Sequence, residues 1–298
     1  MLIRDRLLAR LAEMGGAPDH QRLAAEVLGI RNATPELARR LVAQALVVED
    51  RREAWRRAGE QIAAKAPAAP GVYVLRDESA RAVYVGKANN LRRRLRAHFA
   101  TRRWRGLKAP FARIADAEWQ EVGSEVEALL REASLIEELQ PAANVQVGAP
   151  NLETRAIPAT LVRDVIVVVP SVDPESAELV AARADGGWLI ARTPRDGSQL
   201  KTDAMRLMRF FQSPLRDRFE SSRLAPIVFS WLAGRGANAS RIDPHDAPTS
   251  AGLRTRLRAL LADADLFVER IVVLNSEIRM THRSAASAKA GRPRRARP

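Results

Sequence analysis

Two short runs of β-branched and aromatic residues, eleven positions apart, constrain the fold of this 298-residue chain more than any other feature. The runs are Gly71–Leu75 and Val83–Gly86, and each carries a glycine and one of the chain's two tyrosines, Tyr73 and Tyr84. Residues 77–79 between them are typical of a turn. The pattern predicts an antiparallel hairpin on which the tyrosines lie close together and the glycines permit close backbone approach.

A helix loaded with arginine is predicted next, over Ala88–Phe99. Leu91, Leu95 and Phe99 recur at helical spacing and define a buried stripe. Most of the arginines point away from this stripe. Arg94 and His98, four residues apart, fall on its flank. Arg94 is therefore expected to lean toward the sheet, beside the only histidine of this region.

A second helix is predicted from about Glu125, because Ser124 and Glu127 fit a capping box. Glu132 falls in the middle of the apolar face of this helix. An unpaired buried carboxylate costs several kcal/mol, so Glu132 needs a partner. Two partners fit. One is Arg94, in a structural ion pair, and the other is a divalent cation such as Mg²⁺, whose coordination shell one carboxylate, waters and phosphate oxygens would complete.

The net charge of +14 is concentrated in two places. Residues 84–113 contain ten Lys or Arg and no acid, and residues 283–298 contain six more and again no acid. The rest of the chain is nearly neutral, so compositional drift toward arginine does not account for both stretches. They predict a polyanion partner, DNA. The candidate DNA-binding residues are Arg92, Arg93, Arg96, Arg102, Arg103, Arg105 and Lys108.

Composition excludes several other classes of site and location. There is no cysteine, which excludes disulfides, Cys-ligated zinc, iron–sulfur clusters and thiol catalysis. The four histidines are widely separated, which argues against a multi-His metal site. No apolar run reaches the length of a membrane span, and the N-terminus lacks a signal-peptide layout. We therefore expect a cytoplasmic, nucleoid-associated protein without membrane contact.

The N-terminal region, residues 1–62, is predicted to be helical. Helices are expected over residues 2–14 and 19–28 and from Thr34, which is an N-cap before Pro35. Residues 46–57 suggest a strand, a turn and a strand. This layout is typical of a winged helix-turn-helix, which would turn Arg39 and Arg40 toward DNA. It is equally compatible with a helical packing domain without DNA contact.

After an Ala/Pro linker over residues 63–70 and the central domain over 71–150, a mixed α/β domain is predicted for residues 155–280. Strands are expected at 165–169, 179–184 and 188–193, the last two forming a hairpin around Asp185-Gly-Gly187, and at 267–274. Helices are expected near 199–211, 221–232 and 251–261. This region contains no recognisable chemical motif.

Residues 283–298 are predicted to form a disordered basic tail that acts as an electrostatic tether. Its Gly291-Arg-Pro293 core also resembles an AT-hook. The fold class is α/β of the α+β kind.

The central motifs resemble those of the GIY-YIG nuclease family, in particular its UvrC and Cho (UvrC-homologue) branch. The resemblance rests on Pro70–Tyr73, Tyr84–Leu95, Glu127–Ile136 and Pro141–Asn144, in register over about a quarter of the chain. Valine replaces isoleucine in both triplets that name the family. The resemblance implies a small three-stranded antiparallel sheet flanked by helices, which cuts DNA with a single divalent ion, Mg²⁺ or Mn²⁺.

The resemblance also implies roles for individual residues. Glu132 would be the metal ligand, and Arg94 would stabilise charge on the scissile phosphate. Tyr84, with Lys87 nearby, would deprotonate or orient the attacking water, and Tyr73 would support the nucleophile and phosphate. The remaining matched positions would complete or support the site: His98, where family members have Tyr or His, together with Gly86 and Asn144.

The rest of the chain departs from the UvrC pattern. Nothing after Asn144 resembles the second nuclease domain, the helix-hairpin-helix tail or the cysteine cluster expected of UvrC. We therefore expect a single-incision endonuclease that acts on damaged or branched DNA in nucleotide excision repair, with repair-complex proteins as partners. The competing hypothesis is a non-catalytic DNA-binding or regulatory protein that retains the fold.

Overall fold

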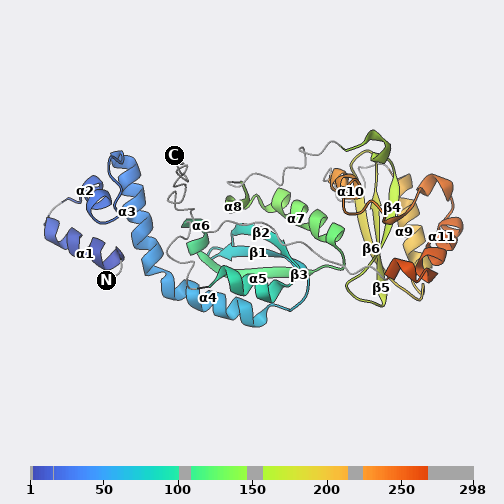
Figure 1. The fold of residues 1–298 in the computed structure, drawn as a ribbon, viewed down its shortest axis with the longest axis horizontal. Coiled ribbons are helices and arrows are strands. Elements are labelled where there is room, and N and C mark those ends of the chain that lie inside the picture. The colour runs from blue at the N-terminus through green and yellow to red at the C-terminus, as the bar shows by residue number, and fades with distance from the viewer. Residues whose placement is uncertain (1–2, 16, 101–108, 146–156, 214–223, 268–298) are drawn as a thin grey trace, which may run out of the picture.

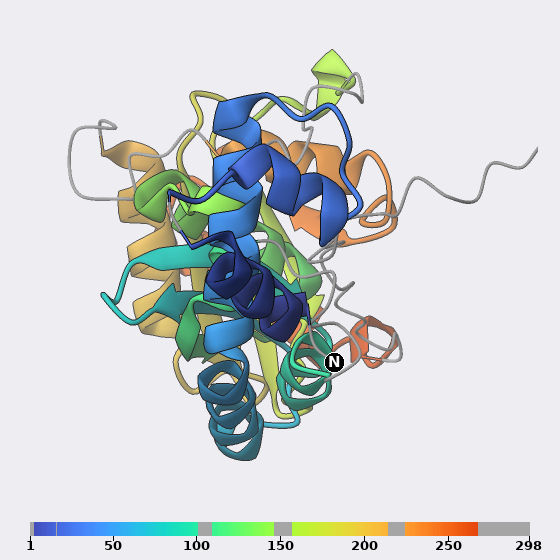
Figure 2. The same cartoon turned by 90° about the vertical axis from the view of Figure 1, so that its left-hand side faces the viewer.

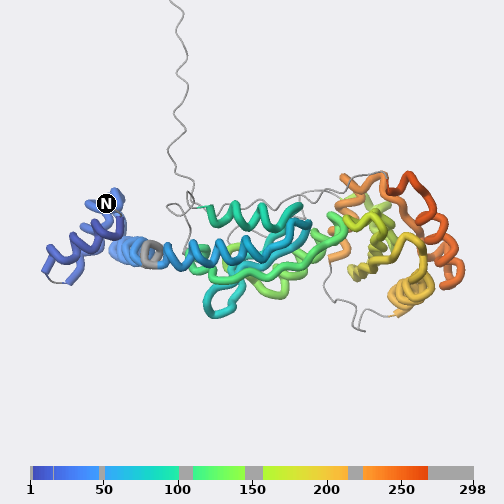
Figure 3. Tube along the Cα trace, turned by 90° about the horizontal axis from the view of Figure 1, so that it is seen from below, coloured from blue at the N-terminus to red at the C-terminus, as the bar shows by residue number. Residues whose placement is uncertain are grey.

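The computed structural model describes residues 3–15, 17–100, 109–145, 157–213 and 224–267. Along its longest axis the molecule shows three bodies in a row: a group of helices, a three-stranded sheet flanked by helices, and a four-stranded sheet flanked by helices (Figures 1 and 3). This mixture of helices and antiparallel sheets confirms the predicted fold class. Across the described ranges, no helix has both the length and the apolar character needed to cross a membrane.

The N-terminal body contains α1 (Ile3–Met14), α2 (His20–Glu26) and α3 (Pro35–Asp50). Figure 2 views the molecule from this end, with these helices in front. A small core joins them, built around Leu7, Leu23 and Val42. The predicted cap of α3 is present, because Thr34 Oγ1 accepts a hydrogen bond from the Leu37 amide at 3.3 Å.

The strand, turn and strand predicted for residues 46–57 are wrong, and with them the wing of the winged helix-turn-helix. α3 continues to Asp50, and α4 (Arg52–Lys65) begins after Arg51. Along α4, Glu53 pairs with Arg56 and Arg57, and Arg56 pairs with Glu60. Ion pairs at these helical spacings, together with the good helix formers around them, outweigh the β propensity of a short valine run.

Helix α4 packs against the central sheet domain. Trp55 Nε1 donates a hydrogen bond to the Phe111 carbonyl at 3.1 Å, and the Trp55 and Phe99 ring centroids lie 5.1 Å apart. A Cβ on Gly59 would lie 2.4 Å from Phe99 side-chain atoms, so a glycine permits this close approach. The predicted boundaries at 62 and 63 therefore fall inside a helix that shares the core of the central domain.

The central domain contains β1 (Gly71–Asp77), β2 (Ala82–Ala88) and β3 (Ile114–Glu121), in the order β2-β1-β3. Both strand pairs are antiparallel, so the predicted hairpin and three-stranded sheet are confirmed. Four helices accompany the sheet: α5 (Leu91–His98), α6 (Ala109–Ala112), α7 (Glu125–Leu139) and α8 (Ala142–Val145). Figure 1 shows α4 and α5 on one side of the sheet and α7 on the other.

The C-terminal domain contains β4 (Val165–Pro170), β5 (Ser176–Ala182), β6 (Trp188–Pro194) and β7 (Ser240–Ile242), in the antiparallel order β6-β5-β4-β7. The predicted β5–β6 hairpin is thus confirmed. Helices α9 (Leu200–Gln212) and α11 (Ser250–Ala262) share one apolar core with the sheet, and α10 (Ala225–Leu232) shares a second. Short 3₁₀ helices lie at Ala159–Leu161, Pro244–Asp246 and Asp265–Phe267.

Two predicted segments of the C-terminal region extend beyond the described residues. The strand predicted for residues 267–274 starts at Phe267, which closes a 3₁₀ helix, and the rest of that strand lies outside the described residues. The predicted basic tail, residues 283–298, also lies outside them.

Candidate active site

The two tyrosines project from the hairpin onto one face of the small sheet. Tyr73 is paired with Gly86 across the β1–β2 ladder, and two positions further along each strand Leu75 is paired with Tyr84. Because side chains alternate between faces along a strand, all four residues lie on the same face of the sheet. The ring centroids of Tyr73 and Tyr84 lie 6.1 Å apart, as close as the hairpin predicted. A Cβ on Gly86 would approach atoms of both rings to 2.7–2.9 Å. Gly86 is therefore the residue that gives both rings room.

Helix α5 places His98 and Arg94 against this tyrosine face. The helix begins at Leu91, later than predicted, because Ala88 still pairs in β2 and the Asn90 side chain caps the helix by accepting from the Arg93 amide at 2.9 Å. His98 is buried, and its Nε2 lies 2.7 Å from the Tyr73 hydroxyl oxygen. Arg94 is half-buried, as its helical position predicted.

The Tyr73 phenol holds its proton firmly. Burial is the main cause, and it raises the pKa of Tyr73 to about 12. Arg94 opposes this shift through its charge and a hydrogen bond, whereas the negative charge of Glu132 reinforces it. Tyr73 is therefore neutral at physiological pH. Because Arg94 and Glu132 both act on the same phenol, residues from α5 and α7 lie within electrostatic reach of one another.

The buried carboxylate of Glu132 on α7 pairs with Lys87 on β2. Glu132 Oε2 lies 3.0 Å from Lys87 Nζ, and the two side chains are only 9% and 11% exposed. Sequence reasoning left Arg94 and a divalent cation as possible partners, and the structure adds Lys87. Within this pair the carboxylate is the group suited to a hard cation, since a carboxylate oxygen is the ligand that Mg²⁺ takes from a protein, with waters and phosphate oxygens completing its shell.

Asn144 on α8 holds the exposed edge of β2. Its Oδ1 accepts from the Val85 amide at 2.8 Å, and its Nδ2 donates to the Val85 carbonyl at 2.9 Å. These two bonds replace the ladder partners that an edge strand lacks. Asn144 thereby supports the strand that carries Tyr84 and Lys87, which agrees with the supporting place that the resemblance implied.

Three of the predicted DNA-binding residues lie within the described part of the chain. Arg92, Arg93 and Arg96 are exposed on α5, and Arg92 Nε also donates to the Ala66 carbonyl at 2.7 Å. Their exposure leaves a basic helix surface beside the candidate site. The other four candidates, Arg102, Arg103, Arg105 and Lys108, lie outside the described residues.

Sequence reasoning missed some residues that build the site. Phe111 packs against Tyr84 with ring centroids 6.0 Å apart, and its carbonyl receives the Trp55 indole proton. Phe111 stands alone after a basic stretch, and Trp55 lies in a region that was assigned to another domain. Neither position had a periodic signal that linked it to the tyrosines.

The residues that build the candidate site lie in a segment that matches a known family. Residues 69–145 match the family model described as a UvrC-like GIY-YIG domain. This segment belongs to the UvrC-like GIY-YIG family. The matched range begins after α4 and ends at the last residue of α8, so it contains every candidate catalytic residue. It leaves out α4, although Trp55 and Ile62 of that helix lie in the same apolar core as the tyrosines.

Similar sequences are found in much longer proteins. UvrABC system protein C of Pelodictyon phaeoclathratiforme is 43% identical over 83 residues, and that of Mycobacterium tuberculosis is 45% identical over 85 residues. Each match covers 27% of this chain and 13% of the relative. The chain therefore spans only a small part of the length of these relatives, and the similarity concerns the GIY-YIG domain.

One solved structure matches part of the chain. It is the GIY-YIG N-terminal endonuclease domain of UvrC from Thermotoga maritima, bound to its catalytic divalent cation, magnesium. The two are 30% identical, and the match covers 29% of this chain and 94% of that chain with a TM-score of 0.25.

Proposed function

We propose that this protein is a metal-dependent DNA endonuclease that makes one incision in damaged or branched duplexes during repair of the nucleotide-excision type. One observation carries the proposal: the buried Lys87–Glu132 pair lies within electrostatic reach of the Tyr73–His98 pair, inside a UvrC-like GIY-YIG domain. Desolvated ionisable groups gathered in this way are typical of catalytic sites. A role in DNA binding alone would not need them.

Glu132 would hold the divalent ion, Mg²⁺ or Mn²⁺. When bound, the ion would supply positive charge at the scissile phosphate. Lys87 Nζ, 3.0 Å from the Glu132 carboxylate, would balance the charge of that carboxylate and help to orient the attacking water. Because the carboxylate is buried, it is held in one place by its surroundings, which suits a ligand that must bind with few protein contacts.

The other site residues would have two roles, which are stabilising charge and transferring protons. Arg94, half-buried and hydrogen-bonded to Tyr73, would stabilise negative charge on the phosphate. Tyr73 keeps its proton, so it would donate a hydrogen bond rather than act as the base. Tyr84 and His98 then remain as the groups that would accept the proton of the water.

DNA would bind along the basic surface of α5, at Arg92, Arg93 and Arg96, with further contacts from the basic residues predicted in 101–108 and 283–298. The N-terminal helices would add affinity through Arg39 and Arg40, which are exposed on α3. Repair proteins would act as partners, and the protein would work in the cytoplasm, on the nucleoid. The incision is proposed to be single because the similarity to UvrABC system protein C is confined to one GIY-YIG domain.

The test is metal-dependent nicking of a lesion-bearing or flapped duplex by the full chain. Glu132→Gln keeps the shape of the side chain but removes its charge, so nicking should fall by about two orders of magnitude or more. Glu137→Gln, an exposed position on the same helix, is the matched control and should nick like the wild type. DNA affinity should be similar in all three proteins.

Two outcomes would contradict the proposal. If Glu132→Gln nicks as fast as Glu137→Gln, Glu132 is not the metal ligand. If the wild type binds these duplexes but nicks none of them with Mg²⁺ or Mn²⁺, a non-catalytic DNA-binding role replaces the proposed activity.

A further inference from the structure

Helix α7, which carries Glu132, is buried on two sides. Ala128 packs on the small sheet, in a cluster with Val72 and Val122. Another side of the helix presents Val126, Leu130 and Ala133 to the C-terminal domain. There they share one core with residues of β4, β5 and α10, namely Val167, Val180 and Phe229. The same helix is therefore part of the nuclease domain and part of the C-terminal domain.

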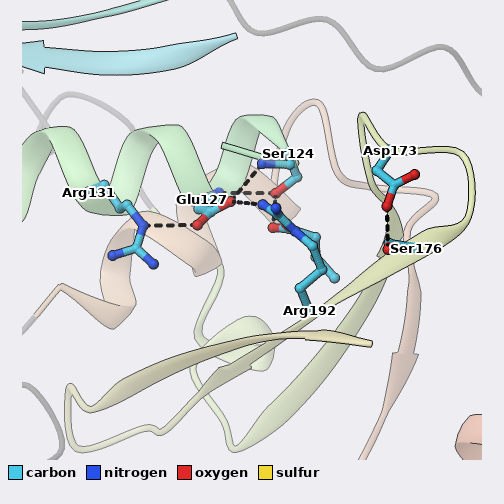
Figure 4. A network of polar contacts seen from close by, with 8 residues as sticks. Ser124, Glu127, Arg131, Asp173, Ser176 and Arg192 are labelled. Atoms are coloured by element: carbon cyan, nitrogen blue, oxygen red, sulfur yellow. Dashed lines mark hydrogen bonds and ion pairs between the residues drawn. The ribbon is translucent and has the colours of Figure 1, made fainter. Parts of the chain in front are cut away.

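A polar network fixes the first turn of α7 to the C-terminal sheet (Figure 4). Arg192 on β6 lies between two carboxylates: its Nε donates to Glu178 Oε1 at 2.9 Å, and its Nη2 lies 3.1 Å from Glu127 Oε2. Glu178 on β5 is fully buried and accepts from Ser124 Oγ, the N-cap of α7, at 2.9 Å. Glu127 also accepts from the amide of Gly123, the residue before the N-cap, at 2.7 Å.

Further contacts hold the same turn. Glu125 forms an ion pair with Arg235 and accepts from Trp231 Nε1 at 3.3 Å. The Gly123 carbonyl accepts from the Val172 amide at 2.7 Å. The start of α7 is thus held through backbone, neutral and charged contacts, all made by the C-terminal domain.

We propose that the C-terminal domain positions the catalytic centre, with Arg192 and Glu178 acting as positioning residues that set the place of Glu132 through helix α7. The inference rests on the proposed function, because it assigns Glu132 to the metal. Glu127 and Glu132 are five residues apart on one helix, or about 7.5 Å along its axis. A shift of the first turn therefore carries Glu132 with it.

Arg192 matters most because of what its loss would leave behind. Without the guanidinium, Glu127 would keep its ion pair with Arg131 at 2.9 Å, but the fully buried Glu178 beside it would lose the cation that it pairs with. A buried carboxylate that has lost its cation is strongly destabilising, and it is relieved either by taking up a proton or by moving away from Glu127 at the start of α7. Either change disturbs the network that holds this turn. A displacement of about 1 Å at reacting groups can lower a rate by about 10²-fold.

The experiment compares full-length Arg192→Gln with the double variant Arg192→Gln/Glu178→Gln, in which one of the two facing carboxylates is neutral. Arg163→Gln removes an exposed arginine paired at 4.0 Å with Asp243 in the same domain, and is the matched control. Two quantities are measured: Mn²⁺ binding without DNA, from the EPR signal of the free ion, and Mg²⁺-dependent nicking, separated into kcat and KM for DNA.

We expect Arg192→Gln to weaken Mn²⁺ binding about tenfold and to lower kcat by a similar factor, with KM for DNA unchanged, because the DNA-binding surface is not touched. The double variant should recover both quantities to within about threefold of the wild type, and Arg163→Gln should match the wild type. If Arg192→Gln does not fold, Arg192→Lys replaces it, with the same direction expected and a smaller change.

Several outcomes would overturn the positioning role. One is a folded Arg192 variant that binds Mn²⁺ and nicks like Arg163→Gln. Another is a double variant as defective as Arg192→Gln, because the uncompensated carboxylate of Glu178 would then not be the cause of the defect. Failure of the proposed function looks different: Glu132→Gln would bind Mn²⁺ and nick like the wild type, whatever the Arg192 variants do.

Discussion

Replacing Gly86 with alanine tests whether close packing places the two tyrosines. A Cβ at this position would lie 2.7 Å from Tyr84 Cε1, 2.8 Å from the Tyr73 hydroxyl oxygen and 2.9 Å from Tyr73 Cζ. Ordinary contacts between carbon atoms are about 3.5–4.0 Å long, so ring atoms must move by roughly 1 Å. Tyr73 and Tyr84 are 0% and 4% exposed, which leaves them no open space to move into.

The expected magnitudes follow from this geometry. Alanine is otherwise favoured over glycine in a strand by about 0.5–1 kcal/mol, and overpacking a buried site costs about 1–3 kcal/mol. We therefore expect Gly86→Ala to lower the free energy of unfolding by about 1–2 kcal/mol. The displaced phenols should lower the nicking rate by about 10²-fold, a larger effect than the loss of stability would suggest.

The assay pairs urea denaturation with nicking at saturating Mg²⁺. Gly187→Ala in the β5–β6 turn is the matched control, because its Cβ would meet Arg183 Cδ at 3.4 Å and the Phe210 ring at 3.6 Å, which are ordinary contacts. The control should nick like the wild type. If Gly86→Ala keeps both its stability and its nicking rate within twofold of the control, Gly86 does not set the tyrosine positions and the reasoning is refuted.

Three further predictions address the support of the site, the domain junction and the tail. Asn144→Ala removes the hydrogen bonds of 2.8 and 2.9 Å to the β2 backbone and should lower the free energy of unfolding in urea by about 2–4 kcal/mol; an unchanged value would contradict its supporting role. Burial and the charge of Glu127, opposed by Arg192 and the Ser124 hydroxyl, raise the pKa of Glu178 from 4.5 to about 7. Its contribution to stability is therefore complete below pH 4.5 and is lost as the pH rises through about 7, so the melting temperature should fall over that range and Glu178→Gln should flatten the fall. A wild-type melting temperature that changes between about pH 5 and 8 in the same way as that of Glu178→Gln would contradict this assignment. Deleting residues 283–298 should weaken DNA binding and its salt dependence without abolishing nicking, and unchanged affinity across several salt concentrations would exclude a tether.

The amphipathic helices were the most predictable part of the site. Helical spacing alone separated Arg94 from Arg92, Arg93 and Arg96, and the structure buries Arg94 partly while exposing the other three. It likewise predicted that Glu132 is buried, which it is, but it did not predict that Glu127 of the same helix is buried as well. These predictions succeed because the helical period is a local property, so a side chain's direction relative to its neighbours does not depend on distant parts of the chain.

Pairing between elements was less predictable. Lys87, which pairs with Glu132, comes from a strand, and helical spacing offers no way to choose it over Arg94. The second buried side of α7 was also missed, because Val126, Leu130 and Ala133 have a use only when the C-terminal sheet packs on them. In the N-terminal region, a short valine run suggested strands where neighbouring residues favour helix.

The sequence by itself determined the GIY-YIG hairpin, the two site helices and the burial of Glu132, because turns, caps and periodicity act over a few residues. Only the tertiary structure decided that Glu132 pairs with Lys87, that α4 completes the nuclease core, and that the C-terminal domain holds the start of α7. Those contacts join residues that are distant in the chain, and they form because each buried charge and each apolar face needs a partner that its own segment does not contain.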